Sequence, residues 1–86
     1  MKEIVFSDHA LIKVEILKRH GIILSKDFIK NAITYPDKID RGYKDRLIAQ
    51  RGMNSEHVLR IVYEEHSDHI LIITLYPARR ERYEED

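Results

Sequence analysis

The stretch that decides the fold is VLRIVYEEHSDHILIITLYPARRERY, residues 58–83. Two runs within it, 58–64 and 70–76, are rich in β-branched and aromatic residues, and a short polar segment separates them. This pattern predicts two strong strands joined by a hairpin loop. The second run is apolar on both faces over its first four residues, so we expect a central strand, covered on both sides, that stops at Pro77. The hairpin is therefore the predicted centre of the core.

Two amphipathic helices are predicted in the first half of the chain. Apolar residues recur at helical spacing over residues 9–20, where Ser7 or Asp8 offers an N-cap and Gly21 offers the left-handed conformation that ends a helix. A second helix is expected over residues 25–35, because its last residue precedes a proline that disfavours further helix. Both helices carry an apolar stripe that needs a partner surface.

The remaining segments predict short strands. Residues 4–6 form an apolar run before the helices, residues 37–41 form a short strand or an extended lead-in, and residues 46–51 alternate weakly. The order is therefore strand, helix, helix, then three or four antiparallel strands. Such segregation predicts an α+β fold in which two helices pack on one face of a twisted antiparallel sheet. From the chain length we expect one domain over residues 1–86.

The composition predicts a soluble cytoplasmic protein with a small core. The chain has no cysteine, so no disulfide or thiolate metal site can reinforce the fold. The pattern of a signal peptide is missing, and the longest apolar run is far too short to span a bilayer. Fifteen Lys and Arg balance fifteen Asp and Glu, which argues against a strong non-specific nucleic-acid binder but leaves room for a local basic site.

The best functional candidate is the terminal cluster Arg79-Arg80-Glu81-Arg82-Tyr83. The planar guanidinium of arginine matches a phosphate with two parallel hydrogen bonds, and tyrosine can stack on a base or exchange a proton. The alternative is a solvated helical tail whose charges share one surface. The cluster alone does not decide between the two.

Arg60 is a charge inside a predicted strand, and its two apolar neighbours must lie on the opposite face of the sheet. If the face of Arg60 is open, Arg60 joins a basic surface. If that face is covered, Arg60 is half of a structural ion pair with a strand neighbour such as Glu64. The sequence leaves both alternatives open.

Four of the five histidines fall in two places. His9 and His20 lie on one side of the first helix, where they can pack or can transfer protons, since imidazole titrates near neutrality. His66 and His69 flank a polar turn, which favours a solvated hairpin tip over a metal site. No phosphate-binding glycine loop, nucleophile elbow or zinc-protease motif occurs in the sequence, so no cofactor or metal is expected.

Three segments, in this order, resemble a group of small prokaryotic proteins: Ser7-Asp-His-Ala10, Lys18-Arg-His-Gly-Ile22 and Tyr76-Pro-Ala-Arg-Arg-Glu-Arg-Tyr83. Together they make the chain similar to a BrnT-like member of the RelE/ParE toxin superfamily. The similarity covers nearly the whole chain.

This resemblance implies a compact α+β fold and the toxin of a type II toxin–antitoxin pair. Such a toxin cleaves mRNA, free or on the ribosome, and a small antitoxin protein neutralises it. The ribose 2′-hydroxyl attacks the adjacent phosphate without a metal, basic residues stabilise the added charge, and a proton donor helps the 5′ oxygen to leave. A toxin-like fold with another target, such as gyrase, or a non-catalytic binding module is the alternative, and the oligomeric state, a homodimer included, is open.

The resemblance also implies a site. By position, Arg60 and Arg79 would contact the scissile phosphate, and Tyr83 would be the stacking or proton-transfer residue. His9 matches the histidine at the start of the family's first helix and is counted with the catalytic group, with its role unassigned. The residues that would follow the RNA backbone are Arg46, Arg80 and Arg82.

Overall fold

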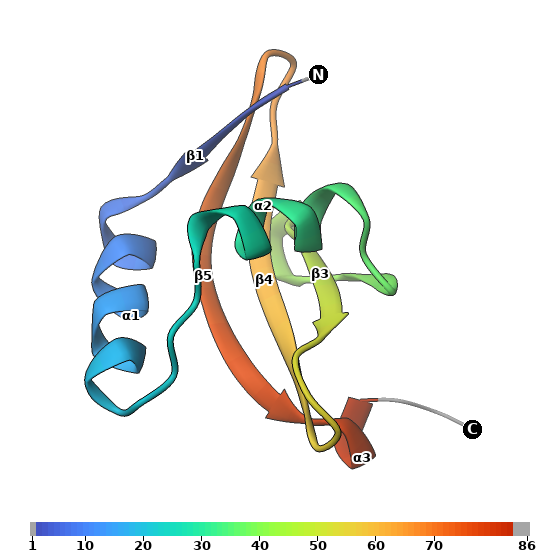
Figure 1. The fold of residues 1–86 in the computed structure, drawn as a ribbon. Helices are drawn as coiled ribbons and strands as arrows, with labels where there is room; N and C mark the ends of the chain where they lie inside the picture. Colours follow the sequence, from blue (N-terminus) through green and yellow to red (C-terminus); the bar gives the residue numbers. More distant parts are fainter. Residues whose placement is uncertain (1, 84–86) are drawn as a thin grey trace.

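The chain folds into a five-stranded sheet with two helices on one face, which confirms the predicted α+β class (Figure 1). The structure is a computed structural model that describes residues 2–83. The elements, in chain order, are β1 (Glu3–Phe6), α1 (Asp8–Arg19), α2 (Lys26–Thr34), β2 (Lys38–Arg41), β3 (Leu47–Gly52), β4 (His57–Glu65), β5 (His69–Arg79) and the short helix α3 (Arg80–Tyr83). One turn of 3₁₀ helix, η1 (Tyr43–Asp45), joins β2 to β3.

The strand order is β1-β5-β4-β3-β2, so the long hairpin of β4 and β5 lies inside the sheet. The four strands after the helices pair antiparallel, as the sequence predicts, and β1 adds a fifth strand parallel to β5. In Figure 1, α1 lies beside β5 and α2 crosses in front of the sheet near β4 and β3. The sheet therefore has two unlike faces, of which α1 and α2 cover one.

The strand β5 continues beyond the predicted stop at Pro77 and ends at Arg79. The backbone N–H of Arg80 points toward β4, because it donates to the carbonyl of Glu56. In an antiparallel ladder the backbone groups of successive residues point to alternate sides, so the nitrogen of Pro77, three residues earlier, points away from β4. β1 pairs only with residues 69–72, and no other strand in the described chain reaches this side of β5 at the proline. A residue without an N–H is tolerated there because no ladder bond is lost.

A bulge in β5 explains why its sequence is apolar on both faces. Tyr63 pairs with Ile72, whereas Val62 pairs with Thr74, so Ile73 is an extra residue on β5. Beyond the bulge the alternation is shifted by one position, and Ile72 and Leu75 are both fully buried in the same core. The apolar run thus reflects a change of register and not cover on both faces.

Each helix begins and ends as its sequence predicts. The N-caps are Ser7 and Ser25, whose hydroxyls accept from the backbone N–H groups of Ala10 and Phe28 at 3.1 and 3.0 Å. Gly21 follows α1 with a φ of +84°, a conformation that glycine adopts without strain. The hydroxyl of Ser7 also donates to a carbonyl of β5 at 3.0 Å, which fixes the start of α1 on the sheet.

The core forms where α1 and α2 meet the sheet. Its buried members are Ala10 and Leu17 of α1, Ile29, Ala32 and Ile33 of α2, and Ala49, Leu59, Ile61, Tyr63, Ile72 and Leu75 of the sheet. Ile12 and Ile16, which the helical spacing adds to the apolar stripe of α1, stay 57% and 41% exposed, so the buried stripe is narrower than predicted. No helix in the described part of the chain is long and apolar enough to cross a membrane.

The face of the sheet opposite α1 and α2, here named the open face, carries a different set of side chains. Leu59 and Ile61 pack in the helix-side core, so Arg60 between them points to the open face. Cross-strand partners share a face, which assigns the neighbouring positions on the other strands. The open face includes Lys38, Asp40, Ile48, Gln50, Val58, Arg60, Val62, Glu64, Leu71, Thr74, Tyr76 and Ala78.

Replacing Ile61 with alanine is expected to lower the free energy of unfolding by about 2–5 kcal/mol, because this fully buried side chain leaves a cavity. The matched change Ile23→Ala, at a side chain that is 78% exposed, is expected to stay within about 0.5 kcal/mol of the unchanged protein. Urea unfolding followed by circular dichroism measures both values. Equal effects at the two positions would contradict the core described above.

Candidate functional site

A row of four polar side chains, here named the polar row, crosses the open face. Lys38 on β2 pairs with Gln50 on β3, Gln50 pairs with Arg60 on β4, and Arg60 pairs with Tyr76 on β5. Directly opposite residues in neighbouring strands have adjacent side chains on one face. The polar row is therefore assembled by the register of four strands.

Arg60 is the centre of the polar row and is only 4% exposed, although α1 and α2 lie on the other face. Its Nε lies 3.2 Å from the hydroxyl of Tyr76, and its Nη1 lies 3.1 Å from Oδ2 of Asp40 and donates to Oε1 of Gln50. Nζ of Lys38 lies 3.8 Å from the same oxygen of Asp40. Burying a charge costs free energy unless the charge is paired and hydrogen-bonded, and three neighbouring strands supply these partners.

These partners keep Arg60 protonated. Burial alone lowers the pKa of a guanidinium, but the hydrogen bonds with Tyr76 and Asp40 outweigh burial and raise the pKa of Arg60 above its ordinary value. The sequence left two alternatives for Arg60, a place on an open face or a structural ion pair, and each is right in part. The helices leave this face open. Arg60 is also ion-paired, but its partner is Asp40 and not Glu64. A fixed positive charge lies in the floor of the open face.

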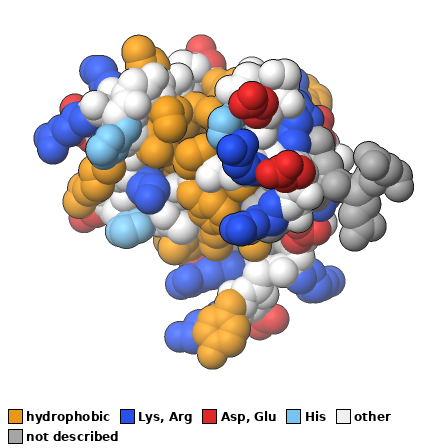
Figure 2. Space-filling model, turned by 90° about the horizontal axis from the view of Figure 1, so that it is seen from below, with side chains coloured by type: hydrophobic (Ala, Val, Ile, Leu, Met, Phe, Trp, Pro, Cys, Tyr) orange, Lys and Arg blue, Asp and Glu red, His pale blue; other side chains and the backbone are white. Residues whose placement is uncertain are grey.

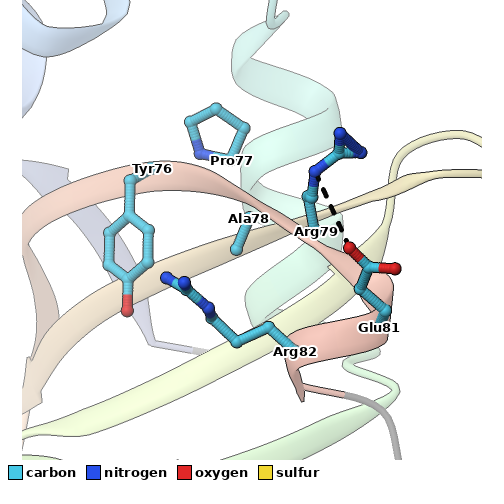
Figure 3. Close-up of a pocket in the computed structure, with 6 residues that line it drawn as sticks. All are labelled: Tyr76, Pro77, Ala78, Arg79, Glu81 and Arg82. Carbon is cyan, nitrogen blue, oxygen red and sulfur yellow. Dashed lines mark ion pairs between the residues drawn. The ribbon is translucent and has the colours of Figure 1, made fainter.

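A surface pocket of about 580 Å³ lies where β5 runs into α3. Its lining residues are Tyr76, Pro77, Ala78, Arg79, Glu81 and Arg82. In Figure 3, the guanidinium of Arg82 extends toward Tyr76, while Arg79 points away from Tyr76 and pairs with Glu81 at 3.9 Å. Arg79 and Arg82 are both exposed, so their charges are accessible from solvent. Tyr76 joins the polar row to this pocket.

Arg80 holds α3 against the turn between β3 and β4. Its Nε donates to the carbonyl of Asn54 at 2.7 Å, and its backbone N–H donates to the carbonyl of Glu56 at 2.9 Å. The guanidinium lies so close over Gly52 that a Cβ added there would collide with it. The structure thus places Arg80, which was expected to follow an RNA backbone, in a contact that anchors the C-terminal helix.

Two other predicted site residues lie away from the polar row, and a third is described only in part. Arg46 pairs with Glu64 at 3.2 Å, near the hairpin end of β4. His9 is exposed at the start of α1, on the helix side and roughly 20 Å along β5 from Arg79, at about 3.3 Å per strand residue. The backbone of Tyr83 lies in α3, but its side chain lies outside the described part of the chain.

The tip of the β4–β5 hairpin carries the stacked rings of His66 and His69, with centroids 4.6 Å apart. The hydrogen bond of His66 to Glu64, at 3.1 Å, and then that of Arg46 lower the pKa of Glu64 below its ordinary value. The hydrogen bond of His69 to Asp68, at 2.7 Å, likewise lowers the pKa of Asp68. Across the described chain, no three His, Cys, Asp or Glu side chains are grouped so that they could hold a metal ion.

At the end of the molecule that carries α3, apolar side chains lie between basic ones (Figure 2). A second pocket, of about 350 Å³, is lined by Ile23, Leu24, Ser25, Phe28 and Met53. Its members come from the segment after α1, from α2 and from the turn after β3, so it opens on the helix side. An apolar surface and the polar row therefore lie on different faces of the sheet.

Sequence reasoning missed Tyr76, Gln50 and Asp40 as partners of Arg60. For Tyr76 the reason is the bulge in β5, since a hairpin with uninterrupted pairing would place Leu75 opposite Arg60 and turn Tyr76 to the other face. For Gln50 and Asp40 the reason is that their contact depends on the pairing of β3 with β4 and of β2 with β3. Arg60 and Tyr76 both interrupt apolar runs, which is a signal of one shared polar face. The observed register is needed to show that Arg60 and Tyr76 are in contact.

Comparison with known protein families, with curated proteins and with solved structures finds no match for the chain. The resemblance drawn from the three sequence segments therefore stays an expectation. The polar row and the pocket beside it are the observations on which a function can be proposed. Tyr76 contacts Arg60, and the pocket that Tyr76 lines is also lined by Arg79 and Arg82.

Replacing Gln50 with leucine is expected to lower the free energy of unfolding by about 1–3 kcal/mol, because the buried guanidinium of Arg60 loses an acceptor. The double change Gln50→Leu with Arg60→Met removes both partners and is expected to cost less than the sum of the single changes, with a coupling of about 0.5–3 kcal/mol. A double-mutant cycle in urea measures this coupling. Additive single effects would show that the two side chains do not form one network.

The change Glu64→Gln is expected to make the stability of the fold depend less on pH between neutral and acid conditions. A carboxylate whose pKa is lower in the folded than in the unfolded chain stabilises the fold above the unfolded pKa, and this stabilisation is lost as the pH falls through the folded pKa. The ordinary pKa of Glu is about 4.3, so the loss begins near that pH and continues below it. Thermal unfolding between neutral and acid pH measures the slope, and an unchanged slope in the variant would contradict this role of Glu64.

Proposed function

We propose that the open face and the adjoining pocket bind single-stranded RNA and cleave it, as the toxin of a cytoplasmic toxin–antitoxin pair. One observation carries the proposal: the hydroxyl of Tyr76 lies 3.2 Å from the buried Arg60, in a pocket also lined by the exposed Arg79 and Arg82. The guanidinium of Arg82 extends toward this phenol, and Arg79 lines the same pocket but points away from Tyr76 (Figure 3), so the pocket offers a site for a phosphate flanked by a base.

The chemistry of these groups suits an RNA strand. The exposed guanidinium groups of Arg79 and Arg82 can each offer two parallel N–H donors to a phosphate. The ring of Tyr76 offers a stacking surface for a base, which does not depend on sequence. Because the whole chain is neutral, attraction to RNA comes from this local group of charges and not from a general basic excess.

The cleavage expected from the resemblance needs positioning and charge stabilisation more than covalent participation of the protein. The ribose 2′-oxygen loses its proton to water and bonds to the adjacent phosphorus, and the bond from phosphorus to the 5′ oxygen breaks. The 5′ oxygen takes up a proton, so the products end in a 2′,3′-cyclic phosphate and a 5′-hydroxyl. Arg79 and Arg82 would stabilise the charge added at phosphorus, and the hydroxyl of Tyr76 or Tyr83 would supply the proton.

A non-catalytic binding module is the second candidate, and the burial of Arg60 favours it. Arg60 is 4% exposed and already contacts Asp40, Gln50 and Tyr76, so a phosphate can contact its guanidinium only if these partners rearrange. In this case the exposed arginines hold a protein partner. Growth inhibition when the protein is expressed without an antitoxin favours the toxin, and its absence together with intact RNA favours the binding module.

Incubation of the purified protein with single-stranded RNA in the presence of EDTA is expected to give fragments with 2′,3′-cyclic phosphate ends. Arg79→Ala is expected to slow cleavage by about 10²–10³-fold, because a charge that stabilises the transition state is lost. Tyr76→Phe keeps the stacking ring and removes the hydroxyl, and its loss of rate measures the hydroxyl alone. Tyr83→Phe makes the same test of the terminal tyrosine.

The matched control is Lys30→Ala, which removes an exposed positive charge from α2 on the helix side. It is expected to leave the cleavage rate unchanged. An RNA substrate with 2′-deoxy sugars throughout is expected to stay intact, because the attacking hydroxyl is missing. Full activity of Arg79→Ala and of both tyrosine variants would remove these residues from the mechanism.

A further inference from the structure

The outer edge of β2 is a part of the sheet that the proposed RNA site does not use. β2 is the last strand in the sheet order, and within residues 2–83 no strand pairs with its outer side. Ile39 of β2 is 50% exposed, and two exposed tyrosines flank the strand in the chain, Tyr35 at the end of α2 at 65% and Tyr43 in η1 at 83%. An edge strand that exposes apolar side chains is a template for pairing with another strand.

The backbone of β2 fixes which residues face outward. The N–H of Gly42 donates to the carbonyl of Arg46 across the β2–β3 ladder at 2.6 Å. Alternation then directs the backbone groups of Lys38 and Asp40 toward β3, and those of Ile39 and Arg41 away from it. Ile39 and Arg41 therefore offer their N–H and C=O groups to a strand laid along the edge.

The charges along this edge are complementary to those of a second copy of the same edge. When two copies of β2 pair antiparallel about a two-fold axis at Ile39, Lys38 stands opposite Asp40 of the second copy. Asp37, which directly precedes β2, instead faces its own chain, because its backbone N–H donates to the carbonyl of Gln50 and its carboxylate accepts from the N–H of Gly52. The two Ile39 side chains meet on the axis. Each contact between opposite charges occurs twice by symmetry.

Other two-fold registers lack this complementarity. An axis at any of the other three residues of β2 places a charged residue opposite itself, so that like charges face each other. The Ile39 register also covers the exposed side chain of Ile39 itself on the axis.

We propose that two copies of the chain pair through β2 as an antiparallel dimer with Ile39 on the two-fold axis. The dimer forms a continuous sheet with five strands from each copy. The axis of such a pair is perpendicular to the sheet, so both helix layers lie on one side and both open faces on the other. Asp40, which binds Arg60 of its own chain, then also meets Lys38 of the second copy.

The dimer is independent of RNA cleavage, because the edge of β2 and the pocket at α3 are different surfaces. Light scattering after size-exclusion chromatography is expected to give the full chain twice its monomer mass of 10.3 kDa. Ile39→Lys and Ile39→Glu are each expected to run as monomers, because like charges meet on the axis. An equimolar mixture of the two variants is expected to restore the dimer, since the introduced lysine faces the introduced glutamate.

The matched control is Ile23→Lys, the same change at a side chain that is 78% exposed in the segment after α1, and it is expected to stay dimeric. Thermal unfolding followed by circular dichroism verifies that each variant is folded. A monomeric wild-type chain at every concentration would overturn the proposal and leave the edge to a strand of another protein. Dimeric Ile39 variants, or a mixture that stays monomeric, would also overturn it.

Discussion

The structure depends on one constraint: a buried guanidinium on a sheet face that α1 and α2 leave uncovered. Arg60 can be 4% exposed only because Asp40, Gln50 and Tyr76 bring oxygen atoms to it from three other strands. A slip of one residue between any two of these strands would turn a partner to the opposite face and leave the charge unpaired. The helix-side core supplies most of the apolar burial, but the polar row specifies the register.

The sequence predicts the elements well, because their signals are local. Ser7, Ser25 and Gly21 mark helix ends through caps and a left-handed residue, and the β-branched runs mark the central hairpin. What it does not predict is the extra residue at Ile73 and the tolerance of a proline within β5. Both depend on which neighbouring strand lies on which side, and that is known only once the sheet is assembled.

The candidate site is predictable to a smaller extent, because its members come from distant strands. The arginine cluster is visible in the sequence, and the fold gives its members different tasks: Arg79 and Arg82 stay accessible, while Arg80 anchors α3. The tyrosine that meets Arg60 is Tyr76, because the bulge shifts the register of β5 by one residue. The proposed dimer would add a second constraint to the same network, since the carboxylate that pairs with Arg60 lies on the edge strand.

The central claim is that RNA binds on the open face at the polar row and the pocket beside it. The most direct measurement is a titration of the isotope-labelled protein with a short single-stranded RNA whose 2′-hydroxyls are methylated, followed by amide chemical shifts. Methylation blocks the attacking group, so that binding is observed without cleavage. The account predicts shifts at Arg60, Tyr76, Arg79 and Arg82, with the amides of α2 unchanged. Shifts confined to α1 and α2, or no shifts at all, would contradict it.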